Sequence, residues 1–120
     1  MSYDVSLCDP VTGAELEVDN PHFLRGGNYC PNGSTELSLN ITYNYGSIFR
    51  RADVLGKDGI PGLDGKTGAE TIPLLQSAIG HLNDDVDDDY WAPTEGNAKR
   101  ALCGLLSFAP MRPDGTWQVC

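Results

Sequence analysis

The stretch ELSLNITY, residues 36–43, carries the clearest strand signal of the chain, because apolar and polar side chains alternate along it without a break. Leu37, Leu39, Ile41 and Tyr43 stand at every second position, with polar residues between them. Successive side chains of a strand point to opposite faces of a sheet. We therefore expect this strand to bury one face and to leave the other wet or functional.

The sequence before this strand alternates as well. Every second residue is apolar in residues 3–7 and again in residues 14–18, and the link DPVTG, residues 9–13, is made of turn formers. This pattern predicts a hairpin. A second turn signal, PNG at residues 31–33, can reverse a short strand at residues 28–30. The N-terminal part is therefore expected to consist of antiparallel hairpins.

After the strand the spacing becomes helical. Ile48, Ala52 and Leu55 predict a short helix with Asn44 or Ser47 as its cap.

A second helix is indicated by the apolar stripe in residues 75–82. Thr67 and Glu70 match a capping box, but a start there places Pro73 beyond the first turn, where its missing N–H costs a hydrogen bond. Thr71 is therefore the favoured cap.

The strongest helix signal follows Thr94, a good N-cap residue. The apolar stripe of this helix consists of Ala98, Ala101, Leu102, Leu105, Phe108 and Ala109. Gly96 and Gly104 interrupt good helix formers, so we expect a close neighbour at one or both. Pro110 ends the helix, and residues 113–115 turn the tail. Strands followed by helices predict an α+β fold in one domain, residues 1–120: a small antiparallel sheet with two to three helices on one face and the other face uncovered.

Charge restricts the function classes. The chain has 17 acidic and 8 basic residues and a net charge of −9. Such a balance disfavours binding to nucleic acid or to anionic membranes, and it favours a small ligand or a basic protein as partner. No secretory signal or spanning segment is evident, so a cytoplasmic protein is expected. Its four cysteines, Cys8, Cys30, Cys103 and Cys120, are then expected as reduced thiols.

The glycine-rich stretch GKDGIPGLDGKTG, residues 56–68, is too short for collagen and has the wrong spacing for a P-loop. It is interpreted as a mobile connector that closes over a ligand site. Lys66 and Thr67 lie near a predicted helix start, where an anion can be held.

Other polar groups are candidates for ligand binding. Arg25 with Gly26 and Gly27 suits a phosphate, because a guanidinium and backbone N–H groups can converge there. Neutral hydrogen-bonding groups beside aromatic rings suit a sugar and a base, although a solvated sheet face is an equal alternative. These groups are Asn40, Thr42, Asn44 and Tyr45. Trp91 is a further candidate contact, and Arg112 is a further cation that has to gather with Arg25 or Lys66.

The acidic run DDVDDDYW, residues 84–91, fails the calcium-loop pattern at the glycine and at the closing glutamate. It is either a solvated loop or a mimic of a phosphate row. Its carboxylates are Asp84, Asp85, Asp87, Asp88 and Asp89. Tyr90 and Trp91 are interpreted as anchors rather than as a stacking platform. The sequence contains no familiar catalytic motif, and it indicates neither a metal site nor a cofactor.

The segments PHFLRGGNY, LNITYNY, GLDGKTGAETIPLL, DDVDDDYWAPTEGNAKRAL and MRPDGTW together resemble an uncharacterised family of small accessory proteins of bacteriophages and prophages. The resemblance covers most of the chain, and it implies a counter-defence factor inside the host cell.

Three functional hypotheses follow. The first is a binding protein that sequesters a small phosphorylated, nucleotide-derived immune signal of the host. The second is an acidic inhibitor that imitates nucleic acid and occupies the basic channel of a host nuclease or CRISPR effector. The third is a small enzyme that degrades such a signal. Homo-oligomerisation is left open by the sequence.

Overall fold

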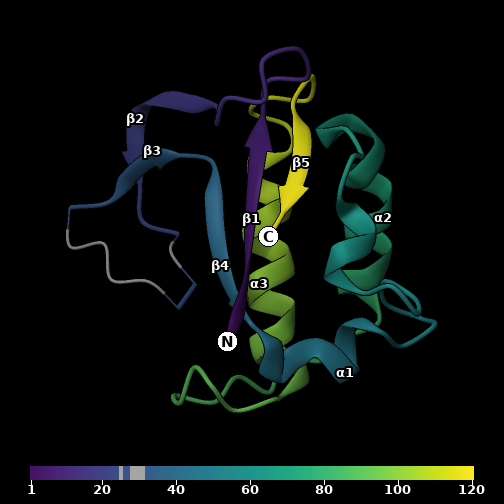
Figure 1. Cartoon of the computed structure of the whole chain (residues 1–120). Helices are drawn as coiled ribbons and strands as arrows, with labels where there is room; N and C mark the ends of the chain where they lie inside the picture. The colour runs from purple at the N-terminus through teal and green to yellow at the C-terminus, as the bar shows by residue number, and fades with distance from the viewer. Residues whose placement is uncertain (25, 28–31) are drawn as a thin grey trace.

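The computed structural model describes residues 1–24, 26–27 and 32–120. Three antiparallel strands form the main sheet in the order β4-β1-β5, with β1 (Ser2–Cys8) in the middle, β4 (Ser38–Thr42) on one side and β5 (Thr116–Val119) on the other (Figure 1). A two-stranded sheet pairs β2 (Glu17–His22) with β3 (Ser34–Glu36). The longer helices are α2 (Gly68–Gly80) and α3 (Glu95–Phe108). Shorter turns of helix are η1 (Tyr43–Tyr45), α1 (Gly46–Phe49) and η2 (Ile60–Leu63).

The register of the main sheet aligns the apolar positions of its strands. Val5 on β1 pairs with Leu39 on β4 and with Val119 on β5, and Leu7 pairs with Trp117. Because side chains alternate, these residues share the face that packs against the helices. Val5, Leu7 and Trp117 are fully buried there.

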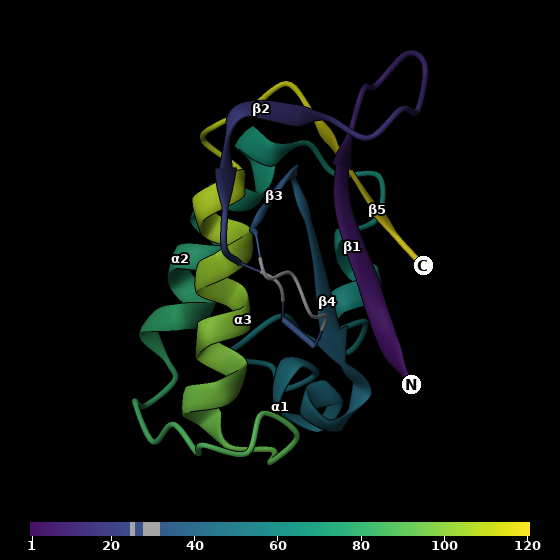
Figure 2. The ribbon, with the colours of Figure 1, turned by 90° about the vertical axis from the view of Figure 1, so that its left-hand side faces the viewer.

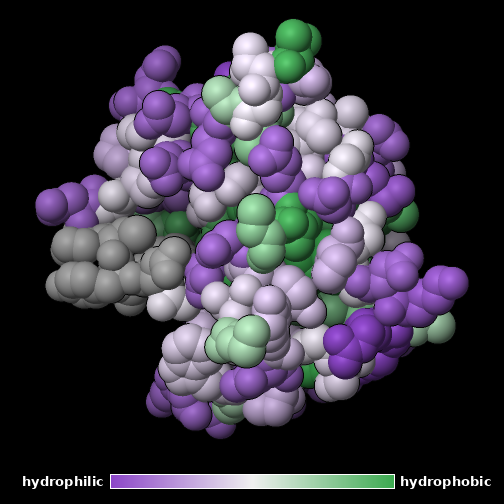
Figure 3. Space-filling view, in the orientation of Figure 1, coloured by the Kyte–Doolittle hydropathy of each residue, from purple (hydrophilic) through white to green (hydrophobic). Residues whose placement is uncertain are grey.

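The helices lie on one face of the sheet. In Figure 1, α3 runs behind the three strands with α2 beside it, and Figure 2, turned by 90°, shows both helices on one side of the sheet. None of the described helices covers the opposite face. That opposite face is shown in Figure 3, where hydrophilic side chains surround a small hydrophobic area near the centre. The predicted α+β architecture, with helices on one face of a small antiparallel sheet, is confirmed.

The strand pairing corrects one prediction. The turn at residues 9–13 does reverse the chain, since the Leu16 N–H donates to the Leu7 carbonyl at 2.9 Å. Residues 17–22 then leave β1 and pair with β3, so the predicted hairpin with residues 14–18 is limited to this start. The neighbours of β1 are instead β4 and β5, because these carry the apolar side chains that complete the buried face, whereas β2 is largely exposed. The short strand expected at residues 28–30 lies outside the described residues.

Two helix caps also differ from expectation. α2 begins after Thr67, which forms a complete capping box with Glu70, and Pro73 lies inside the helix. Two N–H groups of the first turn donate to carbonyls of the C-terminal tail: that of Gly68 to Gly115 and that of Ala69 to Pro113. These hydrogen bonds stabilise the earlier start of the helix. The short helix is capped by neither Asn44 nor Ser47; Thr42 caps η1, which runs into α1.

The last helix agrees with its prediction. Thr94 caps α3 through the N–H of Asn97, and Leu102, Leu105 and Phe108 are fully buried. Both glycines have close neighbours: a Cβ on Gly96 would lie 2.4 Å from the Val86 nitrogen, and one on Gly104 would lie 3.0 Å from a Leu39 methyl carbon.

The glycine-rich segment is packed against the body of the protein. Ile60 and Leu63 of η2 are buried, the Gly65 N–H donates to the Trp117 carbonyl at 2.9 Å, and Asp64 accepts the Val119 N–H. The segment thus covers the edge of β5, across the sheet from β4. The expectation that it closes over a site built on β4 is wrong, because its apolar side chains are needed in the core.

Candidate functional site

A pocket of about 300 Å³ lies beside β4, between that strand and α3. Its lining residues come from the segment after β2, from β4, from η1, from the loop that precedes α3 and from α3 itself. The lining residues are Phe23, Leu24, Gly26, Leu39, Tyr45, Asp87, Asp88, Tyr90, Asn97, Arg100, Ala101 and Gly104. Its volume is at the lower end of the range of ligand pockets, about 300–1,000 Å³.

Two tyrosines form a rigid part of the lining. Tyr45 is fully buried and its hydroxyl donates to the Tyr90 carbonyl. The Tyr90 hydroxyl donates to the Asn40 carbonyl at 3.1 Å and accepts the Thr42 N–H at 3.2 Å. Burial raises the pKa of both phenols, so they stay protonated and act as hydrogen-bond donors at neutral pH. The rings pack edge to face with centroids 5.7 Å apart.

One face of α3 supplies a second wall. Asn97, Arg100, Ala101 and Gly104 have the spacing i, i+3, i+4, i+7, which places them on one side of a helix. Arg100 lies close enough to Tyr45 for its positive charge to oppose, in part, the effect of burial on the tyrosine pKa. Gly104 has no side chain, so Leu39 of β4 can approach the helix at this point.

The buried amide of Asn97 attaches the acidic loop to α3. Its Oδ1 accepts the Asp87 N–H at 3.0 Å, and its Nδ2 donates to the carbonyls of Asp89 and Ala92, each at 3.0 Å. Three hydrogen bonds therefore fix the loop at the point where Asp87, Asp88 and Tyr90 line the pocket. Asn97 is thus a positioning residue rather than a ligand contact.

The outer rim is apolar. Phe23 is 69% exposed and Leu24 is 40% exposed. The imidazole of His22 holds this turn: its Nδ1 accepts the Leu24 N–H at 3.1 Å, and its Nε2 donates to the Glu36 carbonyl. These two bonds select the neutral Nε2–H tautomer.

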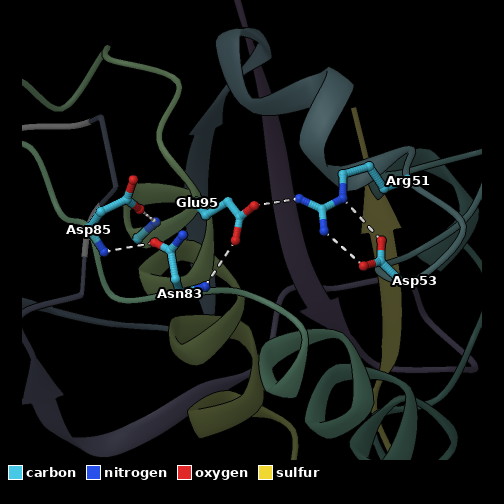
Figure 4. Close-up of polar contacts among 6 residues, drawn as sticks. Arg51, Asp53, Asn83, Asp85 and Glu95 are labelled. Atoms are coloured by element: carbon cyan, nitrogen blue, oxygen red, sulfur yellow. Dashed lines mark hydrogen bonds and ion pairs between the residues drawn. The ribbon is translucent and has the colours of Figure 1, made fainter.

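A charged network anchors the other end of the acidic loop (Figure 4). Arg51 forms ion pairs of 2.7 Å with both Asp53 and Glu95. Glu95 accepts the Asn83 N–H at 3.0 Å, and Asp85 accepts the Gly96 N–H at 2.8 Å. Hydrogen bonds from Arg51 lower the pKa of Asp53, and bonds from the Asn83 N–H and Arg51 lower that of Glu95, so both remain ionised. The loop is therefore tied to α3 on both sides of the pocket wall.

The structure brings together only some of the predicted ligand-binding residues. Gly26 lines the pocket, and the Gly27 N–H donates to the Asn40 carbonyl at 3.1 Å, so this glycine pair covers the edge of β4. Tyr45 also lines the pocket. Arg25 lies outside the described residues.

The polar side chains on and after β4 make structural bonds instead. Asn40 donates to Ser2 and Asp4 on the uncovered sheet face, Thr42 caps η1, and Asn44 donates to the Trp91 carbonyl. Each is committed to the fold and none of the three lines the pocket. They are therefore outside this pocket, and their assignment as the readers of a sugar and a base stays a prediction. Asn40 and Thr42 lie on the polar side of β4, but both are buried, and Asn44 lies beyond the strand in η1.

The remaining predicted contacts are dispersed. Lys66 and Thr67 lie along the outer edge of β5, where the Trp117 N–H donates to the Lys66 carbonyl. Arg112 forms a 3.3 Å ion pair with Asp114. Trp91 is half exposed and packs against the ring of Tyr90, so its interpretation as an anchor is wrong, whereas Tyr90 is an anchor as expected. Because neither Lys66 nor Arg112 lines the pocket, the expected gathering of these cations is not seen in the described residues.

The acidic run is largely occupied with its own loop. Asp84 pairs with Lys99 at 2.8 Å, and Asp85, Asp87 and Asp89 each accept a backbone N–H. These bonds are those of an organised loop. Asp87 and Asp88 nevertheless reach the pocket.

Sequence reasoning missed Arg100 as a site residue. The helical spacing of Asn97, Arg100, Ala101 and Gly104 was a readable signal, because it marks a face beside the apolar stripe. The spacing alone does not show which part of the protein that face of the helix meets.

Comparison with protein-family models, curated proteins and solved structures finds no match to this chain. Within the described residues, no group of three or more His, Cys, Asp or Glu side chains is arranged to hold a metal ion. None of the described helices combines the length and the apolar character needed to cross a membrane. The described cysteines, Cys8, Cys103 and Cys120, are free thiols.

Proposed function

We propose that this protein is a binding protein that captures a small nucleotide-derived ligand in the pocket between β4 and α3. The observation that carries the proposal is the position of Arg100 in a pocket that also contains aromatic and apolar side chains, next to the carboxylates of Asp87 and Asp88. A guanidinium recognises phosphate oxygens bidentately, and aromatic faces stack on a base. Phe23 and Tyr90 offer such rings at the rim and in the wall.

The roles of the walls follow from the hydrogen bonds and the exposure of their side chains. Tyr45, Tyr90 and Asn97 are held by internal hydrogen bonds, so this part of the pocket is preorganised and loses little entropy on binding. Phe23 and Leu24 are exposed and gain the most from contact with an apolar ring. A planar ring is therefore expected at the rim, with its phosphate toward Arg100.

The resemblance to phage accessory proteins provides the biological context of the proposal. In that context the ligand is a nucleotide-derived immune signal of the host cell, and capture lowers its free concentration. Capture needs no catalytic group, and the two histidines serve the fold: His22 holds the rim turn, while Nδ1 of His81 bonds the Ser77 carbonyl.

Calorimetric titration with a panel of mononucleotides and cyclic nucleotides tests the proposal. At least one ligand is expected to bind, and Arg100→Gln is expected to weaken that binding about tenfold or more, because a charge-assisted hydrogen bond is lost. Lys66→Gln and Arg112→Gln are matched controls, since each removes one positive charge away from the pocket. Absence of heat across the panel, or unchanged affinity in Arg100→Gln, contradicts the proposal. Chromatography of the ligand after incubation separates capture from degradation, since capture returns it intact.

A further inference from the structure

The charges around the pocket restrict the charge of the ligand that it accepts. Among the described residues of the lining, Arg100 supplies one positive charge, and Asp87 and Asp88 supply two negative charges. The chain as a whole carries a net charge of −9, so no general excess of cations compensates for this local balance. Every additional negative charge on a ligand therefore meets repulsion from Asp87 and Asp88.

The loop that carries these carboxylates is held in place. Asp87 is bonded at both ends of the residue: its N–H donates to Asn97 at 3.0 Å, and its Oδ1 accepts the Asp89 N–H at 2.8 Å. Swinging the loop away would break these bonds together with those of Asn97 to the Asp89 and Ala92 carbonyls. A bound phosphate has to coexist with both carboxylates. Their oxygens can in turn accept hydrogen bonds from the hydroxyl and amine groups of a nucleoside.

We infer that the pocket selects a nucleotide whose phosphate is a diester, with a single negative charge, over nucleotides that end in a free phosphate. The inference rests on the proposed function and names the ligand class of the same site. A terminal phosphate carries a charge of about −1.5 to −2 at pH 7, because its second pKa is about 6. Arg100 is the one cation among the described lining residues, and its single charge matches that of a diester, whereas the further charge of a terminal phosphate faces Asp87 and Asp88.

Pocket size narrows the class further. A volume of about 300 Å³ is at the lower end for ligand pockets and suits one nucleotide unit. A cyclic mononucleotide combines a single unit with a phosphodiester, so it is the simplest ligand that meets both conditions.

Titration of the full chain with cyclic AMP, AMP and ATP, and with the guanosine series, tests the inference. Within the series that binds, the cyclic nucleotide is expected to bind tightest, the monophosphate about tenfold more weakly and the triphosphate more weakly still. In about 1 M salt the screening length falls to about 3 Å, and the difference should shrink. If AMP or ATP binds as tightly as cyclic AMP, the inference fails while the proposed function stands. If none of the nucleotides binds, the proposed function fails.

The source of the selectivity is tested by the double variant Asp87→Asn with Asp88→Asn. Asparagine keeps the Oδ1 acceptor that the Asp89 N–H needs, so the loop is preserved. The gap between cyclic AMP and AMP is expected to narrow in this variant. The control Asp19→Asn with Asp58→Asn removes the same charge from two exposed positions that do not line the pocket. An equal narrowing in the control would overturn the assignment of selectivity to the pocket carboxylates.

Discussion

Gly96 provides the sharpest test of how the acidic loop is held against α3. Replacement by alanine adds a Cβ that would lie 2.4 Å from the Val86 nitrogen, 2.5 Å from the Asp85 carbonyl carbon and 2.8 Å from the Asp85 nitrogen. All three are backbone atoms of the loop, so no side chain can rotate out of the way. The loop itself has to move, although Asp85, Asp87 and Asn97 bond it to the helix.

The expected magnitude follows from two opposing terms. Alanine stabilises a helix over glycine by about 1 kcal/mol. Forcing a methyl group into a packed site costs about 1–3 kcal/mol, and here the upper end applies because the neighbours are backbone atoms. We therefore expect Gly96→Ala to lower the free energy of unfolding by about 1–2 kcal/mol.

Two other helical glycines serve as controls. A Cβ on Gly80, at the end of α2, meets nothing within 4 Å, so Gly80→Ala should be neutral or stabilising by up to about 1 kcal/mol. The Cβ of Gly104→Ala meets only the two methyl carbons of Leu39, at 3.0 and 4.0 Å, and the change should be near neutral. Urea denaturation followed by circular dichroism gives the unfolding midpoint of each of the three variants. If the slope of free energy against urea concentration is unchanged, a shift in the midpoint reports a change in stability. A Gly96→Ala variant at least as stable as Gly80→Ala would refute the rigid contact between loop and helix.

Three further predictions concern the core, a cap and the acidic loop. The buried indole N–H of Trp117 donates to Thr71 Oγ1 at 2.8 Å, and Thr71→Val leaves it without an acceptor. Urea denaturation should then show a loss of about 1–3 kcal/mol in the free energy of unfolding. Trp117→Phe should cost less in the Thr71→Val background than in the wild-type protein, and strictly additive losses would contradict the bond. Thr67→Ala removes the capping box of α2 and should cost about 1 kcal/mol by the same assay, whereas a start at Thr71 would make it silent. If the protein imitates nucleic acid, asparagine at all five aspartates of residues 84–89 should abolish salt-sensitive inhibition of a nuclease or CRISPR effector, and undiminished inhibition removes that alternative.

Local patterns predicted the elements of this fold well. The alternation of residues 36–43 correctly placed Leu37, Leu39 and Ile41 in the core, and the spacing behind Thr94 correctly predicted α3. Tyr43 was expected on the same face, but it belongs to η1 and is 41% exposed. Both signals depend only on the period of the backbone, which neighbours in sequence carry in full. Thr67 was misjudged because the tail carbonyls that support its first turn are more than forty residues away.

The candidate site was predicted poorly for a related physical reason. Asn40 and Arg100 both belong to elements that the sequence predicts, yet only Arg100 lines the pocket. A strand or helix period states which residues share a face, but not which neighbour that face meets. Asn40 faces the uncovered side of the sheet, and its amide is occupied by Ser2 and Asp4 of β1.

By itself the sequence determined the class of fold, the buried faces of β4 and α3, the net charge and the close approaches at the two glycines of α3. The tertiary structure decided that β1 pairs with β4 and β5, that the glycine-rich segment packs along β5, and that Arg100 meets Asp87 and Asp88 around one pocket. The reason is that secondary structure is encoded over a few neighbouring residues, whereas a pocket is formed by side chains from segments far apart in the chain. Their meeting depends on how the whole apolar surface is buried.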